Sequence, residues 1–218
     1  MYKRQNPGSG AHRVPDATVN RLPTYLRCLA DVTRSGGSTI SSERLADLAG
    51  VNAAKVRKDL SHLGTYGTRG VGYDVDYLRF EVSRALGVAN TWPVVVVGFG
   101  NLGRALANHT GFTERGFPMV VAIDRDPDKT GRSIDGVPVH GHDQLEAVVR
   151  DHAIAIAVIT TPASAAQEVA DRLVDAGIRS ILNFAPTVLA VPDHVEVRAV
   201  DLATELQILG FHLQRHTG

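Results

Sequence analysis

Three glycines in the segment 98–103, which reads GFGNLG, have the spacing of a phosphate-binding turn. The segment follows the apolar run Val94–Val97 and precedes a helix-forming stretch, and this strand-turn-helix context makes the pattern specific. Gly98 permits a tight turn, Gly100 lets the backbone approach a pyrophosphate, and Gly103 allows close packing of helix on sheet. Because N–H groups and the dipole at a helix start attract negative charge, the segment predicts a dinucleotide site.

An acid at the end of the next expected strand points to the kind of dinucleotide. Asp124 stands 21 residues beyond Gly103 (124 − 103), where a carboxylate accepts from the 2′-hydroxyl of the adenine ribose and repels a 2′-phosphate. NAD(H) is therefore favoured over NADP(H). Arg125, Lys129 and Arg132 lie close by and weaken that exclusion, since an arginine suits a 2′-phosphate.

Two later strands also end in residues that can border a ligand. Thr160-Thr161-Pro162 is expected beside the nicotinamide or its ribose, and Phe184 in the segment Asn183-Phe184-Ala185-Pro186 can supply an apolar wall, although both are equally compatible with ordinary loop and core. The predicted cofactor-binding residues are Gly98, Phe99, Gly100, Asn101, Leu102, Gly103, Asp124, Arg125, Thr160, Thr161, Pro162 and Phe184.

Catalytic residues are not expected. A dehydrogenase needs an acid or base at the nicotinamide and a substrate pocket. His109, His140 and His142 fall in the second half of the chain, but none lies in a recognisable catalytic motif, and no Cys/His spacing indicates a metal. The sequence therefore predicts no enzyme activity and no metal site.

The first half carries a pattern typical of DNA binding. Ala46, Gly50 and Val56 have the small, turn and branched apolar types that helix-turn-helix packing needs. On the helix that begins near Asn52, the face opposite Val56 presents small, basic and hydroxyl side chains, which suit phosphates and guanine edges. The predicted DNA-contacting residues of this helix are Lys55, Arg57, Lys58 and Ser61.

A glycine-rich stretch follows this helix. Gly64, Gly67, Gly70 and Gly72 surround Arg69 and predict a β-hairpin with a basic tip. Such a hairpin resembles the wing of winged-helix proteins, in which an arginine can enter the narrow minor groove of A·T-rich DNA. Arg69 is therefore a predicted DNA contact.

The elements around these motifs indicate two domains of an α/β protein. In the first half we expect helices over 17–34, around Leu45, from Asn52 to Leu63, and from Asp74 or Asp76 to Gly87. In the second half, strands and helices alternate, which favours a Rossmann-like doubly wound parallel sheet. The expected segments there are Val94–Val97, Leu102–Asn108, Met119–Ile123, Gln144–Val149, Ile154–Ile159, Ala165–Ala176, Ser180–Asn183, Val195–Val200 and a last amphipathic helix, Leu202–Leu213.

The expected boundaries are a flexible tail at 1–15, a DNA-binding domain at 16–89, an NAD(H)-binding domain at 90–200, and a terminal helix with its tail at 201–218. Residues 1–89 hold 13 Lys and Arg against 8 Asp and Glu, whereas residues 90–218 hold 10 against 15. This uneven distribution of charge suggests that only the front half faces a polyanion.

The single cysteine, Cys28, implies a reducing cytosol, and no apolar run has membrane length. We therefore expect a cytoplasmic protein without a membrane partner.

These motifs together resemble the Rex family of redox-sensing transcriptional repressors. The resemblance covers nearly the whole chain from Arg21-Leu22-Pro23 onward. It is carried by Val56-Arg57-Lys58-Asp59-Leu60, Gly70-Val71-Gly72-Tyr73, Gly98 to Gly103, Asn183-Phe184-Ala185-Pro186 and Asp201-Leu202-Ala203-Thr204-Glu205-Leu206-Gln207. It implies a homodimer whose terminal helix, about Leu202 to Gln214, is swapped between subunits. It also implies that the repressor binds operators of respiratory and fermentative genes and releases them when NADH binds.

The resemblance also implies residues that couple the two domains. The family's coupling arginine and aspartate match Arg21 and Asp201, and a tyrosine that commonly joins them is replaced by His109. Histidine can hydrogen-bond an aspartate and titrates near neutral pH.

The expected mechanism follows from the charge of the nicotinamide ring. An apolar pocket disfavours the charged ring of NAD⁺, a competing ligand, and accepts the neutral ring of NADH, the effector. NADH then closes the dimer and double-stranded operator DNA dissociates. Two alternatives stay open: a small NAD-dependent oxidoreductase with a basic accessory domain, and a sensor of coenzyme A or another nucleotide.

Overall fold

The computed structural model describes residues 14–65, 67–88 and 90–217, and the chain divides into two compact units, Met1–Ala89 and Asn90–Gly218. Residues 1–13 of the expected tail lie outside the described residues, as does Ala89, the last residue of the expected DNA-binding domain.

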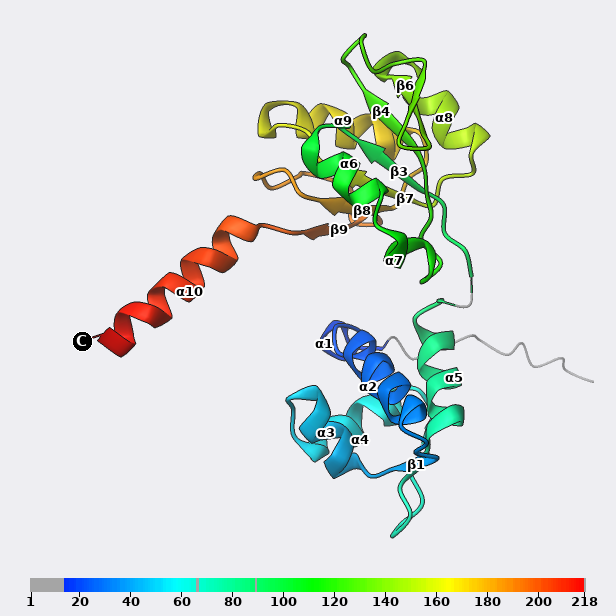
Figure 1. Cartoon of the computed structure of the whole chain (residues 1–218), viewed down its shortest axis with the longest axis vertical. Helices are drawn as coiled ribbons and strands as arrows, with labels where there is room; N and C mark the ends of the chain where they lie inside the picture. The colour runs from blue at the N-terminus through cyan, green and yellow to red at the C-terminus, as the bar shows by residue number, and fades with distance from the viewer. Residues whose placement is uncertain (1–13, 66, 89, 218) are drawn as a thin grey trace, which may run out of the picture. The chain divides into compact units, whose positions relative to one another are not determined.

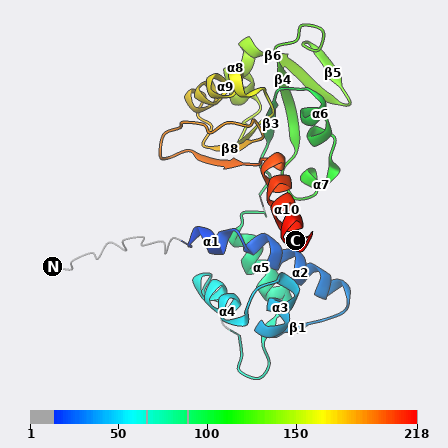
Figure 2. The same ribbon diagram turned by 90° about the vertical axis from the view of Figure 1, so that its left-hand side faces the viewer.

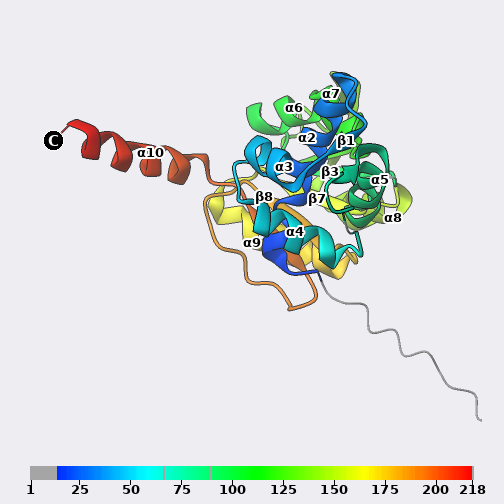
Figure 3. The ribbon, with the colours of Figure 1, turned by 90° about the horizontal axis from the view of Figure 1, so that it is seen from below.

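The first unit is mainly helical, with one small antiparallel sheet. Its helices α2 and α5 pack together, as do α3 and α4, which lie beside each other when seen from below (Figure 3). The elements are α1 (Asp16–Val19), α2 (Leu22–Arg34), β1 (Thr39–Ile40), α3 (Ser42–Ala49), α4 (Ala53–His62), β2 (Tyr73–Asp74) and α5 (Val75–Ala85).

The prediction of a single helix over 17–34 is wrong in one respect, because the structure has two helices there, separated by Asn20 and Arg21. Arg21 is the N-cap of α2, and Pro23 falls in the first turn of that helix. Proline has no N–H and is compatible with a helix only where that donor has no partner within the helix. The chain therefore ends α1 before the proline and starts a new helix.

The turn between α3 and α4 is formed as the sequence predicts. Ser41 accepts a hydrogen bond from the N–H of Arg44 at 3.1 Å, and Asn52 accepts one from Lys55 at 2.8 Å, so each helix has a side-chain N-cap. Gly50 between them has a φ of +66°, a left-handed conformation that glycine adopts without strain. Ala46 and Val56 are both buried in the core of the unit.

The glycine-rich segment forms less regular structure than the expected hairpin. Thr68 and Gly72 make one isolated bridge, and the returning chain pairs instead with β1, with Ile40 opposite Tyr73. Gly72 explains this arrangement, because a Cβ there would lie 2.4 Å from the carbonyl oxygen of Ile40. The close backbone approach anchors the base of the segment to β1 and leaves only its tip as a wing.

The second unit is built on a seven-stranded sheet with the order β5-β6-β4-β3-β7-β8-β9, parallel except for β5 (Figure 1). The predicted doubly wound parallel sheet is confirmed. The elements are β3 (Val94–Val97), α6 (Asn101–Ala107), α7 (Thr110–Thr113), β4 (Met119–Asp124), β5 (Arg132–Ile134), β6 (Val137–Gly141), the 3₁₀ turn η1 (His142–Gln144), α8 (Leu145–Asp151), β7 (Ile156–Ile159), α9 (Ala163–Asp175), β8 (Ser180–Asn183), β9 (Glu196–Ala199) and α10 (Leu202–Thr217).

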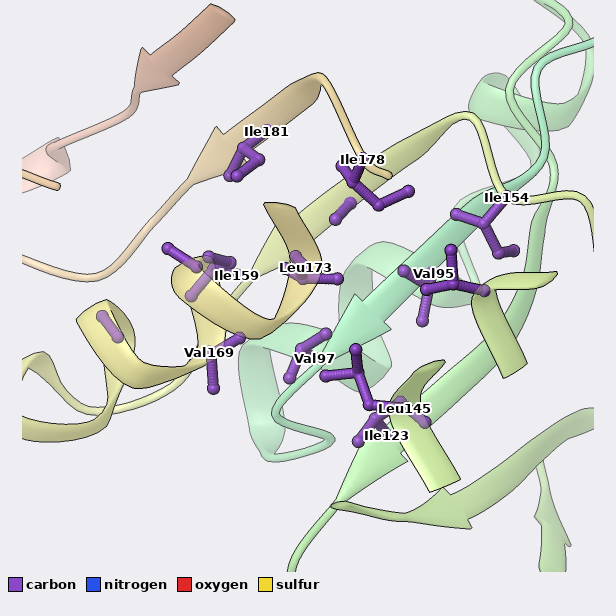
Figure 4. Packing of buried hydrophobic residues seen from close by; sticks show 14 of the residues in the cluster. Val95, Val97, Ile123, Leu145, Ile154, Ile159, Val169, Leu173, Ile178 and Ile181 are labelled. Carbon is purple, nitrogen blue, oxygen red and sulfur yellow. The ribbon is translucent and has the colours of Figure 1, made fainter. Parts of the chain in front are cut away.

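Each face of the sheet has its own core, because alternate residues of a strand point to opposite sides. Val95 and Val97 pack with α8 and α9 through Leu145, Val169 and Leu173 (Figure 4). Val94 and Val96 pack on the other face with Leu106 of α6. Helices therefore cover both faces, with α8 and α9 on one side and α6 on the other (Figure 2).

The sequence missed the β5–β6 hairpin and placed the start of one strand too early. The strand expected from Ile154 begins at Ile156, because Ala153 has a φ of +48° and the chain is still turning there. β5 and β6 are short and partly exposed, and the turn between them passes through Asp135 with a φ of +53°. Neither strand has the apolar run that marks the central strands.

Candidate nucleotide site and DNA-facing surface

The glycine turn after β3 is shaped by contacts with β4 and with the end of β7. The N–H of Gly98 donates to the carbonyl of Ile123 at 2.8 Å, and Gly98 has a φ of +95°. A Cβ at Gly98 would lie 2.9 Å from the Thr160 carbonyl, and one at Gly103 would lie 2.2 Å from the Gly98 oxygen. These two glycines are therefore required by the packing of the turn itself.

Gly100 differs from them, because a Cβ there would meet no protein atom within 4 Å. Its backbone faces open space at the start of α6. The Thr160 hydroxyl lies 2.5 Å from the carbonyl oxygen of Gly98 and holds the turn from the other side. The exposed backbone at Gly100 is thus fixed in place before any ligand arrives.

A cavity of about 580 Å³ lies at the carboxyl ends of β3, β4 and β7, where ligands of doubly wound sheets bind. The structure brings seven of the predicted cofactor residues together in its wall: Gly98, Gly100, Asp124, Arg125, Thr160, Thr161 and Pro162. The hydroxyl of Thr161 is buried and has no hydrogen-bond partner within the described chain.

Five predicted residues do not line this cavity. Phe99 is buried among the residues of the α6 face, and Phe184 packs against the same cluster, so both serve the core. Asn101 and Leu102 point outward from the first turn of α6, and Gly103 is enclosed by the turn. The first turn of α6 therefore presents Asn101 and Leu102 to solvent rather than to the cavity.

Asp124 is held in the cavity wall by three donors. Its Oδ2 accepts from the N–H of Phe99 at 2.7 Å and from the Lys129 ammonium at 3.2 Å, and its Oδ1 accepts from the N–H of Asp126 at 2.9 Å. Burial acts to raise the pKa of Asp124, but these hydrogen bonds outweigh it and lower the pKa below its ordinary value. The carboxylate is charged and forms part of the cavity wall.

Two further residues line the cavity: Lys129, which the sequence placed close to Asp124, and His142, which it did not place at the site. Arg172 of α9 donates to Nδ1 of His142 at 2.8 Å and forms a two-bonded ion pair with Glu146 at 2.7 Å. Burial, followed by the charge of Arg172, lowers the pKa of His142, which therefore stays neutral. His142, Glu146 and Arg172 come from η1, α8 and α9, so no local sequence motif joins the three.

The exposed face of α4 presents Lys55, Arg57 and Lys58 to solvent, whereas Ser61 is half-buried and donates to the carbonyl of Lys58 at 2.7 Å. Arg69 lies exposed near the wing tip. The predicted DNA-contacting side chains are thus on one helix and one wing of the same unit. The acid in this helix, Asp59, is buried.

The three predicted coupling residues have partners within their own units. Arg21 is bound to Asp59, with Nε 2.6 Å from Oδ2 and Nη2 2.7 Å from Oδ1. His109 caps α7 by accepting from the N–H of Gly111 at 3.0 Å. Asp201 precedes α10 and accepts from the Thr204 hydroxyl at 2.9 Å.

Over the ranges that the structure describes, no helix has the length and apolar character needed to span a membrane. Within the same ranges, no three His, Cys, Asp or Glu side chains come together as a metal site would require.

Two family models match the chain. Residues 13–61 match a family described as "Putative DNA-binding protein N-terminus", and residues 89–187 match one described as "CoA binding domain". Among curated proteins, the chain is 56% identical to the redox-sensing transcriptional repressor Rex of Streptomyces coelicolor over 99% of this chain and 84% of that protein. It is 50% identical to Rex of Carboxydothermus hydrogenoformans over 93% of this chain and 98% of that protein.

Solved structures give the same result. The chain is similar to RSP, a Rex-family repressor, in complex with β-NAD⁺ and operator DNA, with a TM-score of 0.89, 36% identity and 94% coverage of both chains. For RSP in complex with β-NADH the TM-score is 0.84 at 34% identity, covering 94% of this chain and 96% of that one. The family is one of transcriptional repressors rather than enzymes. The chain therefore belongs to the Rex family of redox-sensing transcriptional repressors.

Proposed function

We propose that this protein is a transcriptional repressor that binds operator DNA when NADH is scarce and releases it when NADH occupies the second unit. The observation that carries the proposal is one chain with a preformed dinucleotide cavity at Gly100 and a basic recognition helix, α4. A protein of the same fold at 36% identity has been solved with both β-NAD⁺ and operator DNA. We propose a cytoplasmic location, because a repressor must reach the chromosome.

The cavity supports a preference for the reduced cofactor. Val97, Ile123, Ala165 and Val169 give part of its wall an apolar surface. NAD⁺ carries a positive charge on its nicotinamide ring and NADH does not, so moving the ring into an apolar wall costs more for the oxidised form. Asp124 holds the ribose of the adenine end in both cases. NADH is the effector and NAD⁺ the competing ligand.

The exposed apolar side chains of α10 support a homodimer. Leu202, Leu206, Leu209, Phe211 and Leu213 are each at least 57% exposed in the single chain. A helix with so much exposed apolar surface is stabilised by a partner that covers it. We propose that the partner is a second copy, which exchanges this helix and links the two recognition helices into a pair that reads successive major grooves.

Coupling between cofactor and DNA is proposed to involve Asp201 and His109 together with an arginine of the first unit. Arg21 is occupied by Asp59 through two hydrogen bonds. Arg27 is a second candidate, because it is exposed on α2 and, among the described residues, makes no hydrogen bond or ion pair. An arginine without such a partner is available for a contact between units.

Calorimetric titration of NADH with and without operator DNA tests the proposal. Reciprocal linkage requires operator DNA to weaken NADH binding by the factor by which NADH weakens DNA binding, commonly between about five- and 150-fold. Equal NADH affinities in the two titrations would refute the coupling. Operator gel shifts with NADH, NAD⁺, NADPH and coenzyme A compare the ligands side by side, and the match to a CoA-binding family makes the last arm necessary. Turnover of NADH in the presence of small carbonyl substrates would instead favour an oxidoreductase.

A further inference from the structure

A second hollow of about 510 Å³ lies in the DNA-binding unit between the start of α3, the exposed side of α4 and the wing. Two arginines line it, Arg57 from α4 and Arg69 from the wing, and so does one acid, Glu43 of α3. Phosphate groups repel an acid. A surface that faces a polyanion gains nothing in overall affinity from Glu43, so its presence there needs another explanation.

Glu43 and its neighbour Ser42 hold the guanidinium of Arg57. Arg57 Nη1 donates to Ser42 Oγ at 2.9 Å and to Glu43 Oε1 at 3.0 Å. The Ser42 hydroxyl in turn donates to Glu43 Oε1 at 3.2 Å, and Ser42 is only 8% exposed. The three groups form a closed set of hydrogen bonds that fixes the direction of the arginine before DNA arrives.

The position of Glu43 stabilises its negative charge. It lies in the first turn of α3, directly after the N-cap Ser41, where backbone N–H groups are free. A hydrogen bond from its own backbone N–H, followed by one from Ser41, lowers the pKa of Glu43. The side chains of Glu43 and Arg57 are 66% and 54% exposed, and exposed ion pairs contribute little to folding. The consequence of the pair is therefore expected in binding rather than in stability.

We propose that Glu43 is a specificity-determining residue of the recognition surface, because it directs Arg57 toward base edges and reduces its attraction to phosphates of any sequence. An unrestrained arginine can follow the backbone of any duplex, which raises non-specific affinity. An arginine that is already oriented contacts a guanine edge with little further loss of freedom. The inference rests on the proposed function as a DNA-reading repressor.

The test compares Glu43→Gln with the wild-type protein on two duplexes of equal length. One duplex is the sequence that the wild-type protein enriches from a randomised DNA library, and the other is a scrambled sequence. For Glu43→Gln we expect tighter binding to scrambled DNA and a log–log salt slope that is steeper by about 0.9, the value for one more phosphate contact. The ratio of the two affinities should fall about three- to tenfold, within the range that one bidentate base contact supplies.

Asp47→Asn is the matched control, because Asp47 is an exposed acid at the other end of α3 and makes no contact with Arg57. It changes the net charge equally and should leave the affinity ratio unchanged. In an Arg57→Ala background, Glu43→Gln should also leave the ratio unchanged, because its effect acts through the arginine.

The inference is overturned if Glu43→Gln and Asp47→Asn shift both duplexes equally, or if the effect persists without Arg57. Either result would show a general charge effect. Failure of the proposed function has a different signature, since a wild-type protein without DNA-binding function would enrich no sequence from the library.

Discussion

The guanidinium of Arg21 donates two hydrogen bonds to the carboxylate of Asp59, which joins the N-terminus of α2 to the recognition helix α4. Tyr25 and Thr18 each donate one more, both at 2.8 Å, so the buried carboxylate has four donors. Asp59 lies between Lys58 and Leu60, where it anchors the buried side of α4. The direction in which α4 presents its basic face is therefore set by a buried ion pair.

Asp59→Asn should lower the free energy of unfolding of the first unit by about 2–3 kcal/mol, because the Arg21 charge then stays partly buried without its counter-ion. The shift is measured from urea transitions followed by circular dichroism. Asp31→Asn is the control, since Asp31 is an exposed acid of α2 paired only with Arg34, and it should change little. Equal effects of the two substitutions would contradict the structural role of the Arg21–Asp59 pair.

The same carboxylate predicts a pH dependence. Burial acts to raise the pKa of Asp59, but hydrogen bonds from Arg21, Tyr25 and Thr18 outweigh it, so its pKa in the folded protein is lowered. Its contribution to stability is therefore present above the unfolded pKa of about 3.9 and is lost as the pH falls through the folded value. The stability difference between wild type and Asp59→Asn should be constant near neutral pH and shrink in acid. A difference that grows in acid would contradict the direction of the shift.

Arg21 and Arg27 should have separable roles. Arg21→Ala removes the counter-ion of Asp59 and should destabilise the first unit. Arg27→Ala removes an exposed side chain and should leave stability nearly unchanged, while NADH loses much of its effect on operator binding. Thermal unfolding and operator gel shifts with and without NADH distinguish the two. If Arg27→Ala responds to NADH as the wild type does, Arg27 is not the coupling residue.

Gly100→Val should produce a repressor that holds DNA regardless of NADH. The added side chain meets no protein atom near its Cβ, so the unit should fold, yet its methyl groups occupy the path of the pyrophosphate. NADH affinity should fall at least about a hundredfold, or about 2.7 kcal/mol at RT ln 100. Calorimetry measures it, and Ala105→Val on the exposed face of α6 adds similar volume away from the cavity. Release of DNA from Gly100→Val by NADH would overturn the phosphate-site assignment.

Asp124→Asn should narrow the preference for NADH over NADPH. The negative charge that repels a 2′-phosphate is removed, while Lys129 and Arg125 stay in the cavity wall. We expect NADPH affinity to rise and NADH affinity to fall, so that the ratio of their dissociation constants changes by about tenfold, equal to about 1.4 kcal/mol. Lys129→Met should move the ratio in the opposite direction. Parallel changes for both cofactors would mean that Asp124 only supports the fold of the turn.

Arg69→Ala should weaken operator binding and reduce the log–log salt slope by about 0.9 if the wing arginine neutralises one phosphate. Affinity is measured at several salt concentrations. Arg79→Ala removes an arginine that pairs with Asp76 of α5 and serves as the control. Unchanged binding by Arg69→Ala would exclude the wing tip from the DNA contact.

Local patterns in the sequence predicted most of the fold. The strands β3 and β8 have the predicted bounds, and β3 is a continuous run of valines, as a strand buried on both faces should be. Ser41, Asn52 and Asp74 cap the helices they precede, because capping depends only on residues within one turn. The β5–β6 hairpin lacked such a signal, because its strands are short and lie at the edge of the sheet.

By itself, the sequence determined what chemistry each half can perform: a glycine turn after a buried strand, an acid at the end of the next strand, and a basic helix with a wing. Only the tertiary structure decided which side chains share a surface. Folding turned Phe99 and Phe184 into the core, brought His142 to the cavity, and paired Arg21 with Asp59 and Arg57 with Glu43. The physical reason is that these contacts join residues from separate elements, so no local spacing specifies them, and a buried polar group such as Asp59 must find a partner wherever the fold places one.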